Sequence, residues 1–536
     1  MVAARQSRRP VRSWASSTAL ALLLPVLALV TAPAANAATA EWTSIATGSN
    51  HTCAISGAGQ VYCWGDNSLG QLGSPLPGAP AVDPAATDAP APAAPPPPTP
   101  TPTPVAAPVA GLRIVAVAAG DNHSCALSAE GAVLCWGMNA NGQLGNGVLA
   151  EPGPTPAFSA APVAIVGPLA NRKVTAIAAG GNNTCAVAES GEVYCWGDNS
   201  AGQLGIGAAG AARPTPTRVL PKGLLVGRTV TQLVVGDLHV CALDSQGLAF
   251  CWGSNAFGQV GSGVPHRGGE GGQYLVPTPV LPTPLDDSVP APTPVTISSL
   301  SAGSGFTCAI ATSAAKPLPS AYCWGRLLNG RLGNGYSGSN KTASTFTPTA
   351  VPSTGALAKR SLTTISSGGA TTCVLDTQRS AYCWGDGSTG QVGNGEAASA
   401  APLPPTAVKR SGPYSMLGLA QVSVGVNHAC GLNPPDAGGA ASCWGANGSG
   451  QLGTGTLKEG TQGQPRAVRL VAASPSPTSS TTPIPVDPGV PVTPVEPATP
   501  SSGGSLVTTL IAFVAGLVVG ALVTVLVTRR RAPSQP

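Results

Sequence analysis

Short apolar stretches alternate with glycine-, asparagine- and serine-rich turns along most of the chain. One unit has the apolar run IVAVAAG, which ends at Gly120, then HSCAL, the turn SAEG, VLCWG and the glycine-rich NANGQLG, which ends at Gly145. Short strand patterns bounded by Gly, Asn, Ser and Pro at regular spacing are typical of an all-β repeat array. We therefore predict strands throughout, with long helices only at the two ends of the chain.

The unit that contains Cys-Trp-Gly recurs seven times, and an internal repeat of this length indicates stacked supersecondary units. Successive tryptophans are separated by 72, 60, 56, 72, 60 and 60 residues. We interpret them as core residues whose indole N–H groups are hydrogen-bonded. They are Trp64, Trp136, Trp196, Trp252, Trp324, Trp384 and Trp444.

All 14 cysteines lie in these units, two in each. A turn centred on Ala58 places Cys53 directly opposite Cys63, and opposed residues on antiparallel strands have Cα atoms about 4.5–5.5 Å apart, within disulfide reach. Zinc sites usually show C-x₂₋₄-C spacing, which this chain lacks. We predict one disulfide per repeat: Cys53–Cys63, Cys125–Cys135, Cys185–Cys195, Cys241–Cys251, Cys308–Cys323, Cys373–Cys383 and Cys430–Cys443. The fifth and seventh pairs are wider and predict longer hairpin loops.

Both ends of the chain carry targeting patterns. Residues 1–37 combine four arginines, an apolar stretch and the cleavage pattern Ala35-Asn36-Ala37, which predicts a removable signal peptide. Residues 506–528 include 21 consecutive uncharged residues, enough for a membrane-spanning helix. The arginines of the tail, residues 529–536, predict a cytoplasmic C-terminus. A sortase-processed tail ends similarly, but no LPxTG motif precedes this one, so we expect a permanent single-pass anchor with the rest of the chain outside the cell.

The charge of the chain depends on these ends. The formal net charge is +5, but seven of the 27 basic residues and none of the 22 acidic residues lie in the signal peptide and the tail. The remainder therefore has a slight excess of acidic residues, which argues against a nucleic-acid partner because such a partner requires a basic surface. An oxidising compartment also favours the predicted disulfides.

The segment GDNHSCALSAEGAVLCWGMNANGQLG, Gly120–Gly145, resembles the repeat of the regulator of chromosome condensation family. The likeness rests on G-x-x-H-x-x-A-L, G-x-V-x-x-W-G and N-x-x-G-Q-L-G, and it extends over residues 41–470. It implies a seven-bladed β-propeller of four-stranded blades around a central channel. The paired cysteines depart from the family pattern. We expect the first apolar run, WTSIATG, to pair with the last blade near Arg466–Leu470 and so close the ring.

The domain organisation follows from the repeats and the low-complexity segments. We assign the propeller to residues 38–473 and a Pro-, Ser- and Thr-rich stalk to residues 474–505. Two proline-rich inserts, residues 75–109 and 262–294, are interpreted as extended, solvated loops. The Ala- and Pro-rich composition, together with the targeting patterns, favours a bacterial origin.

Four histidines occupy one repeat position: His51, His123, His239 and His428. A catalytic or metal role requires histidines that converge, whereas a propeller distributes equivalent positions around its ring. We therefore expect each to be a polar partner for a turn or a neighbouring strand. The GDNS segments lack the calcium-loop pattern and read as turns. We predict no catalytic, metal or cofactor site.

We expect a monomeric, membrane-anchored module that binds an extracellular protein or a cell-wall polymer. The alternative is a protein inhibitor, because a secreted bacterial member of the resembling family inhibits β-lactamases; only likeness of fold supports this. An enzyme is a further alternative, for which the sequence shows no acid–base cluster. Nucleotide exchange on a small GTPase, the family's best-known activity, does not fit an extracellular location.

Overall fold

The computed structural model describes residues 41–74, 98–107, 109–149, 158–220, 225, 227–263, 272–280, 295–314, 316–336, 343–457 and 460–470. The chain divides into two units, residues 1–473 and 474–536, and all described residues belong to the first. The expected signal peptide, stalk, membrane helix and basic tail lie outside the described residues. Within those ranges, the structure contains no helix with the length and apolar character needed to cross a membrane.

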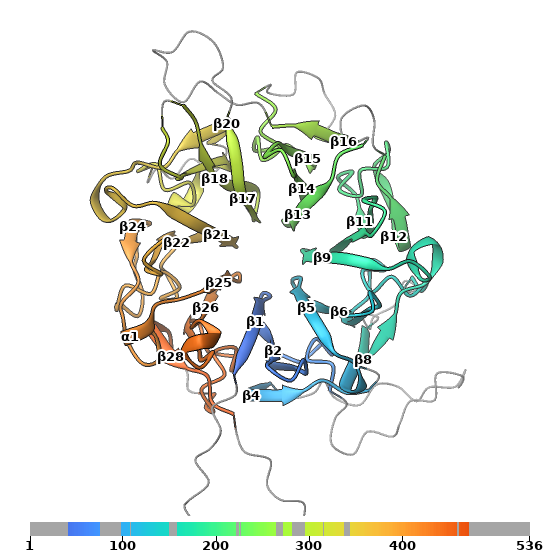
Figure 1. Ribbon diagram of the computed structural model, residues 1–536, viewed down its shortest axis with the longest axis horizontal. Helices are drawn as coiled ribbons and strands as arrows, with labels where there is room; N and C mark the ends of the chain where they lie inside the picture. Colours follow the sequence, from blue (N-terminus) through green and yellow to red (C-terminus); the bar gives the residue numbers. More distant parts are fainter. Residues whose placement is uncertain are drawn as a thin grey trace, which may run out of the picture. The chain divides into compact units, whose positions relative to one another are not determined.

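Seven antiparallel four-stranded sheets form the blades of a ring (Figure 1), which confirms the predicted all-β, seven-bladed propeller. Within each blade the strands are paired in chain order, so every blade is a simple meander. The first strands border the central axis: β1 (Trp42–Thr47), β5 (Ile114–Ala119), β9 (Val174–Gly180), β13 (Val230–Val235), β17 (Thr296–Gly303), β21 (Leu362–Gly368) and β25 (Gln421–Val424).

The second and third strands of each blade are almost entirely buried. The second strands are β2 (His51–Ser56), β6 (His123–Ser128), β10 (Asn183–Ala188), β14 (His239–Asp244), β18 (Phe306–Thr312), β22 (Thr371–Asp376) and β26 (His428–Leu432). The third strands are β3 (Val61–Gly65), β7 (Val133–Met138), β11 (Val193–Asn199), β15 (Ala249–Ser254), β19 (Ser320–Arg326), β23 (Ala381–Gly385) and β27 (Ala441–Gly445).

The fourth strands form the outer edge of the ring: β4 (Thr99–Pro104), β8 (Phe158–Ala164), β12 (Gly210–Arg218), β16 (Gln273–Pro279), β20 (Ser344–Ala350), β24 (Leu403–Ala407) and β28 (Gln462–Ala467). The described connections contain short helical turns: η1 (Val109–Gly111), η2 (Gly167–Leu169), η3 (Leu328–Gly330), η4 (Gly355–Leu357), α1 (Tyr414–Leu417) and η5 (Pro435–Ala437).

Seven disulfides are present, one in each blade, as predicted. Each joins directly opposed residues of the second and third strands, as Cys53 and Cys63 do across β2 and β3. Every cysteine is completely buried. The bridges therefore lie inside the core of each blade, where solvent reductants do not reach them.

The expectation that both proline-rich inserts are loops throughout was wrong for part of each. Residues 99–104, with the sequence TPTPTP, form β4, and residues 273–279 form β16. An edge strand tolerates proline where the missing N–H would face solvent. In β4 each proline alternates with a threonine, so every second residue keeps an N–H for pairing with β3.

Adjacent blades are connected through the repeat tryptophans, all of which are buried. The indole Nε1 of Trp136 in blade 2 donates a hydrogen bond of 2.9 Å to the backbone carbonyl of Gln71 in blade 1. The same contact links every pair of neighbours, including Trp64 of blade 1 and Gln451 of blade 7, at 2.9–3.0 Å. We call each contact an interblade joint.

The ring does not close by strand exchange, so the expected pairing of the first apolar run with the segment near Arg466–Leu470 was wrong. Strand β1 pairs with β2, and β28 pairs with β27. Closure instead uses the same interblade joint as the other contacts, and β1 lies beside β25 and β26 (Figure 1). Trp42 also joins a hydrophobic cluster with residues of blade 7, against which Val468 and Leu470 pack. Each blade is consequently made from one continuous stretch of chain.

Because the joints share one geometry, breaking the joint between blades 7 and 1 should lower the free energy of unfolding as much as breaking any other joint. Trp64→Phe and Trp136→Phe each remove one buried N–H donor, and each should lower the free energy of unfolding by about 1–2 kcal/mol. Denaturant unfolding of the oxidised chain measures both. A much larger loss for Trp64→Phe would show that closure has a contribution the internal joints lack.

The buried bridges predict seven short-range disulfide peptides in the chain purified from its native cells. Digestion under non-reducing conditions followed by mass spectrometry identifies them. Replacing Cys373 and Cys383 together by serine should cost about 2–3 kcal/mol, because the bridge closes a short loop in the unfolded chain. Recovery of mainly free thiols would contradict the assignment.

Candidate functional site

Each repeat histidine contacts the next blade. His123 Nε2 lies 2.9 Å from Thr184 Oγ1, and that hydroxyl donates to the carbonyl of Gln143 at 2.9 Å. The same pattern occurs for His51, His239 and His428. The expectation of a polar partner on a neighbouring strand is confirmed, and the four rings serve the interblade joints.

The hydrogen-bond pattern decides the tautomer of these histidines. A hydroxyl has one proton, and that of Thr184 is donated to Gln143, so His123 must donate from Nε2. Its Nδ1 is buried without a partner, as it is in the other three histidines. Protonation would create a buried N–H with no acceptor. Burial, with a smaller contribution from the nearby His51, accordingly lowers the pKa of His123 to about 3.

Departures from the histidine pattern occur in matched pairs. Blade 3 has Asn183 at this position, and the facing residue of blade 4 is Val240, which has no hydroxyl. Blade 6 has Thr371, and blade 7 correspondingly has Ala429. In blades 3 and 6 the histidine and the facing hydroxyl are therefore lost together, which fits a structural role for the pair.

Blade 5 departs in a different way, because Phe306 replaces the histidine and Arg331 replaces the glutamine of the joint. The Arg331 guanidinium lies 5.6 Å from the Phe306 ring centroid, within cation–π distance. Burial, together with the neighbouring charge of Arg326, lowers the pKa of Arg331 to about 10. Even here the repeat position is used for packing.

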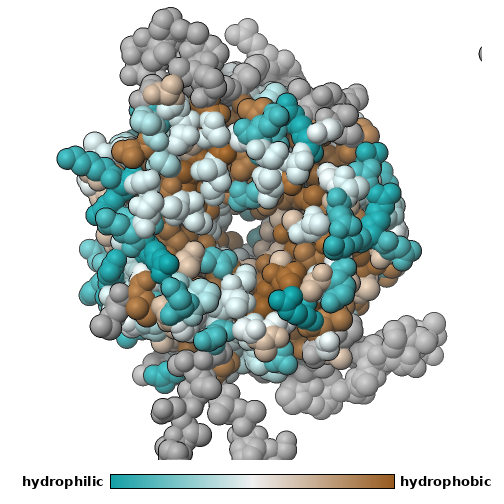
Figure 2. Space-filling model, viewed as in Figure 1, coloured by the Kyte–Doolittle hydropathy of each residue, from teal (hydrophilic) through white to brown (hydrophobic). Residues whose placement is uncertain are grey.

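A channel of about 230 Å³ runs between the first strands and opens at the centre of the ring (Figure 2). Glycine, alanine, serine and valine line most of it; among the described lining residues, only Asp121 and Asp237 are ionisable. Burial and the charge of Asp237 raise the pKa of Asp121 to about 6, although a hydrogen bond from Ser49 opposes the shift. Among the described lining residues, no histidine, lysine or cysteine accompanies these two carboxylates.

Glycines at the ends of the first strands let neighbouring blades approach each other closely at the channel. A Cβ on Gly48 would lie 2.2 Å from Cε1 of His51 and 2.5 Å from the Gly120 carbonyl oxygen of the next blade. No side chain fits at this approach. The channel mouth therefore has backbone at its surface and little room for functional groups.

The hairpins between second and third strands define one face of the ring, which we call the hairpin face. In three blades, an arginine that precedes the first strand contacts a hairpin carboxylate and lies over an aromatic ring of the third strand, at 5.3–5.9 Å from its centroid. These triplets are Arg172–Glu192–Tyr194, Arg228–Asp244–Phe250 and Arg360–Asp376–Tyr382.

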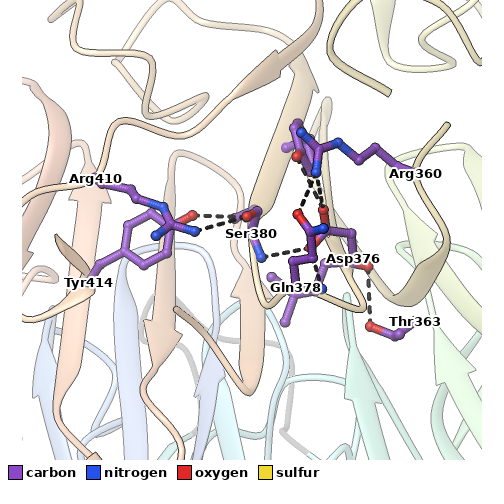
Figure 3. Close-up of polar contacts among 10 residues, drawn as sticks. Arg360, Thr363, Asp376, Gln378, Ser380, Arg410 and Tyr414 are labelled. Carbon is purple, nitrogen blue, oxygen red and sulfur yellow. Dashed lines mark hydrogen bonds and ion pairs between the residues drawn. The ribbon is translucent and has the colours of Figure 1, made fainter. Parts of the chain in front are cut away.

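Blade 6 has the most elaborate hairpin (Figure 3). The buried Asp376 accepts backbone N–H groups of Gln378 and Ser380, both at 2.9 Å, and pairs with Arg360 at 3.3 Å. Arg410 approaches from the other side and donates from Nη2 to Ser380 Oγ at 3.0 Å. Two guanidinium groups are thereby held on either side of one hairpin.

Two further cations have an unusual backbone conformation: Arg379 within this hairpin, and Lys359 beside Arg360 in the chain. Arg379 has φ 61°, at the position where four other blades have glycine with φ between 78° and 92°. Lys359 has φ 58°. A left-handed conformation costs a residue with a Cβ about 1 kcal/mol or more. Arg379 in place of glycine therefore costs stability, and nothing in the core requires its exposed side chain.

Sequence reasoning placed the cysteines and tryptophans in the blade cores but did not find the cations of the hairpin face. Lys359, Arg379 and Arg410 belong to three separate connections that meet only in the folded ring. One signal was available: Arg379 interrupts a position that is glycine in the repeats of blades 1 to 4. No cluster of three or more potential metal ligands occurs among the described residues.

Comparisons with known proteins agree with this architecture. The family model described as RCC1-like domain matches residues 96–482, and models of the regulator of chromosome condensation (RCC1) repeat match residues 42–71 and 58–127. The ultraviolet-B receptor UVR8 of Arabidopsis thaliana is 28% identical over 365 residues, which cover 66% of this chain and 67% of the receptor. The human probable E3 ubiquitin-protein ligase HERC3 is 33% identical over 220 residues, 41% of this chain but only 18% of the ligase.

Among solved structures, yeast RCC1 (Prp20) bound to Kap60 has a TM-score of 0.58 and 21% identity, over 77% of this chain and 84% of that chain. Human WBSCR16 has a TM-score of 0.56 and 21% identity, over 74% of this chain and 88% of that chain. At this level of identity the likeness establishes the fold alone.

The buried histidines predict that the free energy of unfolding decreases below about pH 6.5. Their folded pKa values of about 3 to 4 lie below the unfolded value of 6.5, so the unfolded chain binds more protons between these limits. Each histidine then contributes a loss of about 1.4 kcal/mol per pH unit. The pKa of Asp121 is about 6 in the folded chain and 3.8 in its ordinary state, so the folded chain binds its proton more tightly. Between about pH 4 and pH 6 this offsets the loss of stability caused by one histidine.

Substitution tests this assignment. His123→Asn, which copies Asn183 of blade 3, should reduce the slope of unfolding free energy against pH, measured by denaturant titration between pH 4 and pH 7. Thr371→Asn alters the same repeat position in a blade without histidine and should leave the slope unchanged. Equal slopes for His123→Asn and the unaltered chain would refute the assignment.

Proposed function

Because this chain belongs to the RCC1-like family, we propose that it acts as a binding module and has no catalytic role. The observation that carries the proposal is the use of its repeated polar groups inside the fold. The four repeat histidines and the indole N–H groups serve the interblade joints. We therefore infer that the protein acts through the shape and charge of the two faces of its ring.

We place this module outside the cell, held at the membrane by residues 506–528. The completely buried disulfides in every blade support an oxidising compartment, where such bridges persist. The signal-peptide pattern of residues 1–37 and the arginines after the apolar segment support the same arrangement. The proline-rich residues 474–505 then act as a stalk between ring and membrane.

A protein is the first candidate for the partner. Among proteins of this fold, the yeast RCC1 (Prp20) structure is described as bound to Kap60, and a structure of Prp20p from Saccharomyces cerevisiae is described with its binding properties to Gsp1p and histones. A cell-wall polymer is the alternative partner. Inhibition of an extracellular enzyme is a special case of the first, in which the bound protein loses its activity.

Affinity capture tests the proposal. The full-length chain, oxidised and solubilised in detergent, is immobilised and exposed to the envelope fraction and culture medium of its own organism. We expect one protein to be retained at fixed stoichiometry, and any enzyme so retained can then be assayed for inhibition. The reduced and alkylated chain is the control.

Two outcomes would change the proposal. Retention of wall polysaccharide without a protein would favour the polymer as partner. Turnover of a co-purified substrate, abolished by a point substitution in the ring, would replace the binding module with an enzyme.

A further inference from the structure

Three arginines of blade 6 and its connections meet at one hairpin: Arg360, Arg379 and Arg410. Lys359 precedes Arg360 in the chain, and we call these four residues the blade 6 cation cluster. Arg360 Nη1 donates to Gln378 Oε1 at 2.7 Å, and Arg410 Nη2 donates to Ser380 Oγ at 3.0 Å. Arg379 lies between these two hairpin residues in the sequence. Arg360 and Arg410 therefore lie on either side of the turn that carries Arg379 (Figure 3).

Aromatic rings fix the orientation of two of these guanidinium groups. Arg360 lies 5.5 Å from the centroid of Tyr382, and Arg410 lies 5.6 Å from that of Tyr414. Tyr414 is itself buried and accepts the backbone N–H of Ala381 at 2.9 Å. A stacked guanidinium keeps its N–H edge available in a set plane, which suits paired hydrogen bonds to a carboxylate.

The cluster has fewer counter-charges than cations. Asp376 is buried and engaged by Arg360, and Asp436 approaches Arg379 only at 4.0 Å, with side chains 51% and 77% exposed. Such an exposed pair contributes little. Within the described part of the chain, neither Lys359 nor Arg410 forms an ion pair with a carboxylate.

Blade 3 offers a contrast on the same face. There Glu192 pairs with both Arg172 and Arg218, and Lys173 pairs with Glu189 at 2.7 Å. Each of these three cations thus contacts a carboxylate of the protein, although two of them share Glu192. Blade 6 differs from blade 3 in that Lys359 and Arg410 have no ion pair with a carboxylate among the described residues.

Backbone conformation adds an independent observation. Arg379 and Lys359 are two of the three described non-glycine residues with positive φ, and both belong to this cluster. Four other blades place glycine where blade 6 has Arg379. Unfavourable backbone conformations persist at sites of function, and here the strained residues carry exposed positive charges.

We propose that the blade 6 cation cluster binds an acidic segment of a partner protein. This inference rests on the proposed binding function and adds the face and the chemistry of the partner. Leu417 of α1 is 47% exposed. The next residue, Gly418, lies so close to Arg379 that a Cβ there would be 2.6 Å from the Arg379 Cβ. An exposed leucine close to the exposed Arg379 fits a polypeptide with both carboxylate and apolar side chains better than a hydrated polymer.

Peptide selection tests this inference. The full-length oxidised chain is screened against a display library of random peptides, and selected peptides are measured by fluorescence anisotropy. We expect enrichment of Asp and Glu beside an apolar residue. Arg379→Gly and Arg410→Gln should each weaken binding about tenfold, because each removes charge-assisted hydrogen bonds. Arg379→Gly should not lower the melting temperature, since glycine suits this backbone conformation.

Arg218→Gln is the matched control, because its side chain is 54% exposed on the same face. It removes one positive charge and should leave the affinity unchanged. If all three substitutions weakened binding equally, the loss of affinity would be due to net charge alone, and the inference would be overturned.

The remaining outcomes separate this inference from the proposed function. Selected peptides that bind Arg379→Gly and Arg410→Gln as tightly as the unaltered chain would place the site elsewhere, while the binding function stands. Binding of polyphosphate or anionic vesicles without selection of any acidic peptide would refute the polypeptide partner. Affinity capture of a native partner is independent of both results.

Discussion

The architecture depends on one backbone carbonyl in each blade. This oxygen, at Gln71 in blade 1 and at its equivalents elsewhere, accepts the indole N–H of the next blade and in several joints a Ser or Thr hydroxyl as well. The blades share no strands, so these contacts and the packing around them hold the ring together. A large apolar side chain with one donor suits this task, because it fills the space between blades while satisfying a polar group that burial would otherwise leave unpaired.

The joint also explains the other repeated residues. The leucine after Gln71 enters the core between blades 1 and 2, and the glycine after it lies against Trp136. The histidine bonds to the hydroxyl that the carbonyl accepts. The repeated residues that look like functional motifs in the sequence therefore serve the contact between neighbouring blades, which occurs seven times. Function must therefore be sought where the repeats differ from one another.

The sequence was sufficient to predict whatever repeats. Ten-residue spacing located Cys53 opposite Cys63, and the recurrence of Trp-Gly determined the number of blades. Prediction from the sequence failed where residues come together in the fold without a recognisable pattern in the neighbouring sequence. The TPTPTP segment reads as a linker because proline is rare in strands, yet an edge strand needs only alternate N–H groups. Closure at Trp64 was missed because a joint between residues 387 positions apart requires no special sequence at either end. Lys359, Arg379 and Arg410 come together only once the blade and its connections are folded.

Construction from uninterrupted stretches of chain has a consequence for how such a ring can change. Because the contact between blades 7 and 1 is of the same kind as the other six, the molecule has no structurally privileged beginning. Circular permutants that start at any blade boundary should preserve every strand pairing. Duplication or loss of one gene segment would likewise add or remove a whole blade. All four residues of the blade 6 cation cluster lie between positions 359 and 410, so they would move together with that blade.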